Sequence, residues 1–355
     1  MFRITWNPVT TEWSIEPTAA VWDFVKLAFN ERDECINYDL SHSAEHYDDG
    51  GSINWVRKQT ERGLQVLPYE LIYDYRKKAS TRSWGKVKIS GDYVFPPELE
   101  AHKEATIARL KKQGQLRGNR LCPRVKSVQT QSKGLPIYEL ERATYYDQVG
   151  TNICPDYPLP HPNQVNRKQC LTIREWDKAQ AGIAERGLPS FESSRLANTI
   201  GVAIGIMVPT KSGEFIPIQR YRGGNMAVYQ NTWHLPVSFA LELDPSFAFD
   251  HTCDIKDIIH FDLGNEFTKE TSLERSDFGP LVPLAFCRDL PRCGKPQFFC
   301  ELISKIPYED LQRRMKDISG EYKGKPKLID ADHGNKASEK PSPELACFLA
   351  LKGPR

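Results

Sequence analysis

One helix-forming segment, residues 254–269, places two carboxylates where apolar side chains are expected. Its apolar side chains recur at helical spacing, namely Ile255, Ile258, Ile259, Leu263 and Phe267. At about 100° per residue this spacing predicts an inward stripe, and Asp262 and Glu266 fall near its middle, one turn apart. A buried carboxylate is costly unless it is paired or holds a cation. The pattern favours a bound divalent metal; a salt bridge to Arg220 or Arg222 is the alternative.

Length and composition narrow the class of protein. A chain of 355 residues with 39% hydrophobic residues can bury a sizeable core and predicts two packed units. Lys plus Arg total 48 against 46 acidic residues, so net charge indicates no particular partner. No apolar run approaches the roughly 18 residues of a membrane-spanning helix, and no secretory signal begins the chain. Nine cysteines without a CxxC pair indicate reduced thiols. We therefore expect a cytoplasmic protein with no membrane partner.

The spacing of elements divides the chain into three regions. Residues 1–95 hold five of the seven tryptophans and predict a smaller α+β domain, which is also a candidate surface for a protein partner. Residues 96–195 predict a helix, a strand pair and a proline-rich connector. Residues 196–355 alternate apolar strands with helices, which predicts an α/β layered domain. Within it, the polar segment 320–343 is expected to be a loop.

A basic stretch follows the first region. From Lys103 to Lys126 the chain has eight basic residues and one acid. Such a stripe can contact phosphates, but a solvated helix face is the commoner outcome. No aromatic residues interleave for base stacking, so nucleic acid is not an expected partner.

The last region resembles the Nudix hydrolase superfamily. The likeness rests on segments 197–202 (ANTIGV), 218–222 (IQRYR) and 227–236 (AVYQNTWHLP), and it covers residues 196–355. It implies an α/β/α sandwich with a mixed sheet, in which a loop-helix-loop box presents glutamates to magnesium. The metal then activates water against a diphosphate.

The box itself is degenerate. Residues 261–268 lie over the R-E-U-x-E-E-x-G part of the family consensus, where U is a bulky aliphatic residue. Phe261 replaces the arginine, Asp262 shortens the first glutamate, and Asn265 neutralises the next. Glu266 alone is retained. These departures leave two carboxylates on the helix, which suffice for one metal when a diphosphate supplies further oxygens.

The resemblance assigns roles to particular residues. Glu266 and Asp262 are the expected catalytic pair, holding Mg²⁺ or Mn²⁺. Asp244 falls at the first acidic position of the box, with Glu242 beside it, and either completes or orients the metal shell. The metal lowers the pKa of a bound water and neutralises the diphosphate.

The same resemblance supplies a ligand-binding set. Arg220 and Arg222 are expected to clamp phosphate oxygens. Trp233 and Tyr229 are candidates to stack on a base, although a core or rim position is the more usual role for such residues.

Two functions follow from these expectations. Segment 138–152 resembles the branch of the superfamily that hydrolyses UDP-glucose and UDP-galactose, so the first is metal-dependent hydrolysis of a nucleoside diphosphate linked to another moiety, such as a UDP-sugar. The second is a nucleotide-binding sensor that keeps the pocket without turnover, as the altered box suggests. Either predicts a nucleotide or nucleotide-sugar ligand.

Overall fold

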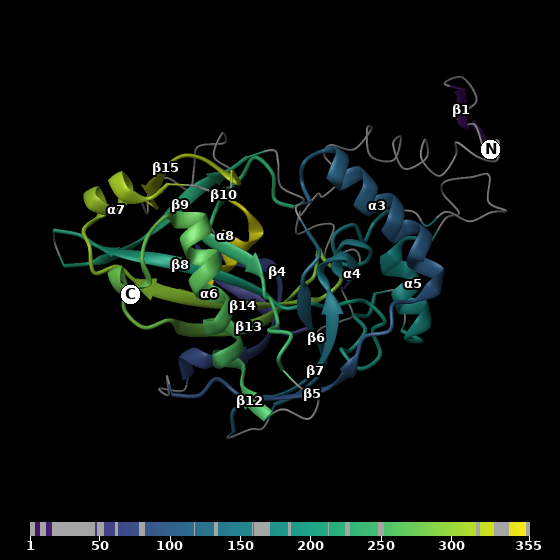
Figure 1. The fold of residues 1–355 in the computed structure, drawn as a ribbon, viewed down its shortest axis with the longest axis horizontal. Helices are drawn as coiled ribbons and strands as arrows, with labels where there is room; N and C mark the ends of the chain where they lie inside the picture. The colour runs from purple at the N-terminus through teal and green to yellow at the C-terminus, as the bar shows by residue number, and fades with distance from the viewer. Residues whose placement is uncertain are drawn as a thin grey trace.

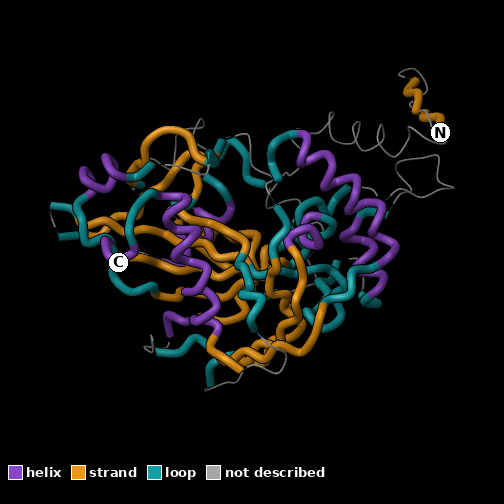
Figure 2. Tube along the Cα trace, in the orientation of Figure 1, coloured by secondary structure: helices purple, strands orange, loops and turns teal. Residues whose placement is uncertain are grey.

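The chain has a mixed α/β fold, with strands in the interior and helices around them (Figures 1 and 2). The computed structural model describes residues 4–7, 12–15, 47, 53–60, 63–77, 82–116, 118–130, 134–157, 159, 171–183, 186–211, 213–223, 228–247, 252–316, 320–329 and 341–352. The α+β character expected of residues 1–95 falls partly outside this set, at residues 16–46 for example, and stays a prediction.

The larger sheet is mixed and has the strand order β10-β9-β8-β14-β13-β4-β3, with β11 also paired to β8 and β15 to β9. Its β8–β14 pair is parallel, and its other pairs are antiparallel. Its strands are β3 (Trp55–Thr60), β4 (Gly63–Asp74), β8 (Gly201–Pro209), β9 (Phe215–Arg222), β10 (Trp233–His234), β11 (Val237–Ala240), β13 (Val282–Asp289), β14 (Lys295–Ile303) and β15 (Tyr322–Leu328).

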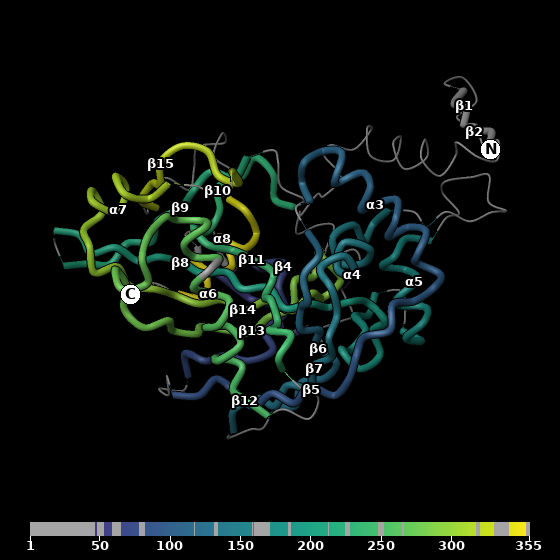
Figure 3. The backbone as a smooth tube through the Cα atoms, viewed as in Figure 1, coloured from purple at the N-terminus to yellow at the C-terminus, as the bar shows by residue number. Residues whose placement is uncertain are grey.

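A smaller sheet lies beside it and has the order β12-β5-β7-β6 (Figure 3). Its strands are β5 (Lys86–Asp92), β6 (Leu121–Gln129), β7 (Ile137–Thr144) and β12 (Thr252–Asp254). Its β5–β7 pair is parallel and the others are antiparallel. The amide of Val125 in β6 donates to the carbonyl of Asn198 at 3.1 Å, just before β8, which joins the two sheets. Two further strands, β1 (Ile4–Asn7) and β2 (Glu12–Ile15), pair with each other.

The helices are α3 (Glu100–Lys112), α4 (Tyr145–Val149), α5 (Ile173–Gln180), α6 (Ile255–Thr271), α7 (Tyr308–Arg314) and α8 (Pro343–Lys352), with short 3-10 turns η1 (Tyr75–Lys77), η2 (Pro97–Leu99) and η4 (Arg275–Asp277). No helix in the described ranges is long and apolar enough to cross a membrane.

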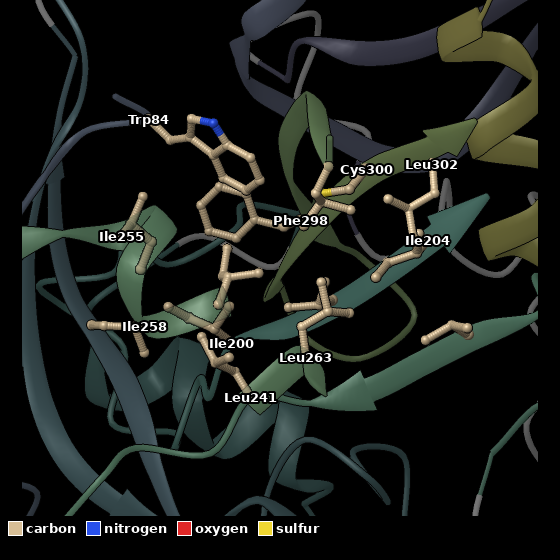
Figure 4. Close-up of a cluster of buried hydrophobic side chains, with 14 of the residues drawn as sticks. Trp84, Ile200, Ile204, Leu241, Ile255, Ile258, Leu263, Phe298, Cys300 and Leu302 are labelled. Atoms are coloured by element: carbon tan, nitrogen blue, oxygen red, sulfur yellow. The ribbon is translucent and has the colours of Figure 1, made fainter. Parts of the chain in front are cut away.

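Helices α6 and α8 cover opposite faces of the larger sheet. One face of β8 carries Val202, Ile204 and Ile206, which belong to the same buried cluster as the apolar stripe of α6. The other face carries Ala203 and Met207, which cluster with side chains of α8. Alternation along a strand explains this division, because successive side chains point to opposite faces. Figure 4 shows the first cluster between α6 and strands β8 and β14.

The helix predicted from the apolar stripe is confirmed. It begins after Asp254, whose side chain accepts a hydrogen bond from the Lys256 amide at 2.9 Å, and it ends at Thr271. All five apolar residues of the stripe are at most 2% exposed. The two carboxylates of the stripe, Asp262 and Glu266, are also buried.

Two features differ from the organisation that the sequence suggests. The expected loop 320–343 contains β15, which pairs with β9. In addition, both sheets cross the boundaries drawn at residues 95 and 195. Strands β3 and β4 hydrogen-bond into the sheet that contains β8, and the smaller sheet combines strands from all three regions.

Candidate metal and ligand site

Three carboxylates converge beside the buried face of α6. Asp262 and Glu266 lie one turn apart on this helix, and Glu242 follows strand β11, which pairs with β8. One carboxylate oxygen from each lies within 4.8 Å of the other two, a spacing at which the group can hold a metal ion. The backbone amide of Glu242 also donates to Oδ2 of Asp262 at 2.8 Å, which fixes the strand end against the helix. The fold thus brings together three of the four predicted metal ligands.

Two basic side chains neutralise part of this cluster. Arg120 donates from Nη1 to Oε1 of Glu266 at 2.6 Å, and the same nitrogen lies 3.4 Å from Oε2 of Glu242. Lys269, one turn along α6, lies 2.7 Å from Oε1 of Glu266. The Arg120 side chain is 40% exposed, so it can leave the cluster without unpacking a core. Its guanidinium stands between two of the carboxylates that a metal would share.

The environment moves the pKa of the two helix carboxylates in opposite directions. Burial raises the pKa of Asp262 to about 6, with Glu266 and Glu242 adding to the shift and the Glu242 amide opposing it. Burial also acts on Glu266, but hydrogen bonds from Lys269 and Arg120 outweigh it and lower the pKa of that carboxyl. Asp262 is therefore the member of the cluster whose charge is least compensated by the protein.

A cavity of about 320 Å³ adjoins the cluster, and Glu266 is on its wall. Its size falls near the lower end of small-molecule sites, which span roughly 300–1,000 Å³. The wall carries charges of both signs, supplied by Arg120, Arg222, Arg292, Lys295, Glu266, Glu270, Glu321 and Glu344. Burial raises the pKa of Glu270 well above its ordinary value, which favours a neutral acid there. The lining therefore combines apolar side chains with many hydrogen-bond donors.

Buried ion pairs hold several of these cavity-wall groups in place. Glu344 of α8 accepts from Arg292 and lies 2.9 Å from Nε2 of His234, and it also accepts from Ser238 Oγ at 2.9 Å. Arg292 is paired in addition with Asp289 at 2.6 Å. The charges of Arg292 and Glu344 are thus satisfied within the protein, and helix α8 is tied to the cavity wall.

The two predicted arginines are placed differently. Arg222 lies on the cavity wall, and its Nη1 is 3.1 Å from Nε2 of His234. Arg220 is not among the described residues that line the cavity. It donates to the carbonyl of Glu270 and packs over the Tyr322 ring, 4.2 Å from its centroid.

The remaining predicted residues make other contacts. Trp233 packs in the second core, with its ring 5.5 Å from that of Tyr221. Tyr229 is buried and donates to Oδ2 of Asp289 at 2.7 Å. Asp244 accepts from the Ser246 amide at 2.8 Å, and the described metal-ligand group does not include it. The binding roles of these residues stay predictions.

Most side chains of the cationic wall were not predicted from the sequence. Arg120 belongs to the basic stretch between Lys103 and Lys126, which indicated a solvated face. Lys295 could have been noticed in the sequence, because a lysine there begins the largely apolar segment that forms the buried strand β14. Arg292 lies in the turn between β13 and β14 and carries no pattern that marks it as buried.

Comparison with known proteins gives little further guidance. No protein-family profile and no curated protein sequence matches the chain. One solved structure that aligns with it is described as the crystal structure of a Nudix hydrolase from M. smegmatis, RenU. The alignment covers 41% of this chain and 78% of that one, at 12% sequence identity and a TM-score of 0.26. This level of similarity assigns neither a family nor an activity to the chain.

Proposed function

We propose that this chain hydrolyses a nucleoside diphosphate linked to another moiety, such as a UDP-sugar, with a divalent metal held by Glu242, Asp262 and Glu266. The observation that carries the proposal is the convergence of these carboxylates beside a cavity whose wall includes Glu266 and several cationic side chains. An all-carboxylate donor set suits Mg²⁺ or Mn²⁺. When bound, such an ion neutralises diphosphate oxygens and lowers the pKa of a coordinated water.

The chain's own residues account for the other requirements. Asp262 and Glu266 are fixed by the buried face of α6, and the backbone of Glu242 is fixed by the hydrogen bond that its amide donates to Asp262. Because Asp262 is buried with little compensation, a cation at this position offsets the cost of its charge. Glu242, and not Asp244, supplies the third carboxylate in this proposal.

Arg120 links the metal cluster to the ligand. It now occupies the space between Glu242 and Glu266, so an ion that enters must displace it. Its partly exposed side chain is then available to phosphate oxygens in the adjoining cavity, where Arg222 also lies. Base stacking by Trp233 or Tyr229 would require each ring to leave its present core contacts.

The proposal includes the fold of the domain. A mixed sheet between α6 and α8 supports a Nudix-like α/β/α sandwich. A cytoplasmic location and a protein partner that binds residues 1–95 stay predictions.

One observation favours a second function, nucleotide binding without turnover. Glu266 is paired with both Arg120 and Lys269, so the cluster is electrostatically satisfied with no metal present. In that case the protein binds its ligand through the cationic wall, and the ligand raises the melting temperature by mass action.

The test is a hydrolysis assay over a panel of nucleoside diphosphate derivatives, with Mg²⁺, with Mn²⁺ and with EDTA. We expect turnover that requires metal and that Glu266→Gln abolishes. Asp257→Asn is the matched control, because Asp257 is an exposed carboxylate on the same helix. Its activity should equal that of the unmodified chain.

Two results would decide against hydrolysis at this site. Turnover that survives Glu266→Gln would place the chemistry elsewhere. A ligand-induced rise in melting temperature that persists in EDTA, without turnover of any panel member, would support the binding function.

A further inference from the structure

The first residues of strand β14 place two buried polar side chains on the cavity wall. Lys295 is 2% exposed and Gln297 is 1% exposed, and both line the cavity. Because they are two apart on a strand, their side chains project from the same face. They belong to a different element from Glu266, the carboxylate of the proposed metal site that lines the cavity.

Lys295 has no close carboxylate partner among the described residues. Its Nζ donates to the Pro296 carbonyl and to Oε1 of Gln297, both at the long distance of 3.5 Å. The nearby carboxylates, Asp289 and Glu344, are paired with Arg292. A buried ammonium normally requires a close anionic or strongly polar partner.

The titratable and charged groups around Lys295 come from several elements. Arg292 lies in the β13–β14 turn, Asp289 ends β13, Glu344 is on α8, and Cys122 is in β6. Burial lowers the pKa of Lys295 to about 7; the Arg292 charge adds to this effect, and the carboxylates oppose it. The ammonium is thus only partly populated near neutral pH, and an added anion would favour it.

Two further donors on the same cavity wall have no acceptor within the described part of the chain. They are Nε2 of Gln297 and Nε of Arg222, and both atoms are buried. Buried donors without an acceptor are rare, because each loses its hydrogen bonds to water on folding. A wall with surplus donors is suited to a ligand that supplies acceptors.

Gly201 makes this arrangement possible. It lies opposite Gln297 in the parallel β8–β14 pair. A Cβ atom at this position would overlap both Oε1 of Gln297 and Nζ of Lys295. The absence of a side chain on β8 therefore leaves the room that the two polar groups of β14 occupy.

We propose that Lys295 and Gln297 form an oxyanion-binding subsite, which receives phosphoryl oxygens of the ligand without the help of a metal. The subsite rests on the proposed function for the identity of the ligand, but it does not depend on hydrolysis. The Lys295 ammonium and the Gln297 amide donate to the oxyanion, and Arg222 supplies a third donor on the same wall. Binding of the anion draws a proton onto Lys295.

The experiment is calorimetric titration of the full chain with inorganic pyrophosphate in EDTA at pH 8, in two buffers of different ionisation enthalpy. We expect binding accompanied by proton uptake. Lys295→Met, which keeps the length of the side chain and removes its charge, should weaken binding roughly tenfold to hundredfold and abolish the uptake. Lys305→Met is the matched control, since Lys305 is exposed and donates to the Ser276 carbonyl, away from the cavity.

A second variant covers the case in which Lys295→Met fails to fold. Gln297→Glu keeps the shape of the side chain and places a carboxylate beside Lys295, so it should exclude pyrophosphate and keep Lys295 protonated. Absence of pyrophosphate binding to the unmodified chain would overturn the proposal. So would binding with unchanged affinity and proton uptake in either variant.

The outcomes separate this proposal from hydrolysis. Pyrophosphate binding in EDTA that depends on Lys295, with no turnover of the nucleotide panel, supports the subsite and rejects hydrolysis. Turnover that depends on Glu266, with pyrophosphate binding that is indifferent to Lys295, supports hydrolysis and rejects the subsite.

Discussion

At the scale of single residues, the site contains charges that the fold holds at a cost. Asp262 accepts one backbone hydrogen bond and is otherwise near two other carboxylates. Lys295 is buried beside Arg292, a group of the same charge. Structural charges in proteins are usually paired, so uncompensated ones mark places where a ligand completes the structure.

Asp262→Asn should therefore stabilise the metal-free protein. The pKa of Asp262 is raised from 3.8 to about 6, so at pH 7 its ionised form opposes folding. At about 1.4 kcal/mol per pKa unit, the gain is up to roughly 3 kcal/mol. The asparagine keeps an acceptor for the Glu242 amide. Urea unfolding in EDTA measures the gain, and Asp257→Asn should change the free energy of unfolding by no more than about 0.5 kcal/mol. A destabilised Asp262→Asn protein would instead identify the carboxylate as a structural partner.

Lys295→Met should stabilise the protein in a pH-dependent way. The pKa of Lys295 is lowered from 10.5 to about 7 in the folded chain. Below pH 7 both states carry the proton, and the folded state bears the full cost of the buried charge. Between pH 7 and 10.5 the unfolded state binds more protons, so the stability of the unmodified chain rises with pH and the advantage of the variant shrinks. We expect a gain on the order of 5 kcal/mol at pH 6 and little at pH 10.5. Unfolding at a series of pH values tests this, and a gain independent of pH would contradict it.

At the scale of elements, the start of helix α6 fixes the position of the acidic cluster. Asp254 caps the helix through the Lys256 amide, and it also accepts from the Trp84 amide at 3.0 Å and from the Ser83 hydroxyl. One carboxylate thus joins α6 to the segment that leads into β5.

Asp254→Ala should destabilise the protein by about 1–3 kcal/mol, since loss of an N-cap costs roughly 1 kcal/mol and the link to Trp84 is lost as well. Asp254→Asn should reduce the free energy of unfolding by less, because asparagine is also a good N-cap residue. Chemical unfolding of both variants measures the difference. Equal losses would show that the contribution of Asp254 is its charge and not its hydrogen bonds.

Elements with a clear apolar period were predictable from the sequence. Helix α6 begins and ends within two residues of the predicted segment 254–269. Strand β15 was missed because its sequence, YKGKPKL, has glycine, proline and lysines in place of alternating apolar residues. It is held by pairing with β9, a long-range contact that no local pattern encodes.

Part of the candidate site was also predictable from the sequence. Asp262 and Glu266 stood out because they interrupt an apolar stripe, whereas Glu242 was placed by the resemblance to the Nudix box. The cationic wall did not stand out, because Arg120 and the Arg292–Lys295 segment are far apart in the sequence and meet only in the folded chain. Burial of Lys295 depends on the absence of a side chain at position 201 of the neighbouring strand, which is a property of the pairing and not of either segment alone.

At the scale of the whole molecule, the sheets tie the N-terminal region to the rest. Strand β4 pairs with β13, and β5 lies between β7 and β12. A region that supplies strands to both sheets cannot be removed without exposing unpaired backbone and apolar faces.

Deletion of residues 1–95 should therefore yield protein with no cooperative unfolding transition. Deletion of residues 1–15 is the comparison, because β1 and β2 pair only with each other in the described part of the chain. That shorter deletion should leave the melting temperature within a few degrees of the full chain. Calorimetry of both proteins tests this, and a folded, active 96–355 fragment would show that the first region is an independent module.

The position of Arg120 between Glu242 and Glu266 has a consequence for the order in which ligands act. In the proposed function, uptake of a divalent ion is an exchange of one cation for another, and the released guanidinium turns to the anion in the cavity. The ion and the anion then each raise the affinity for the other, by the same factor. Arg120 would thus couple the binding of the metal ion to the binding of the anion. The protein with the anion bound should therefore bind the metal ion more tightly than the ligand-free protein does.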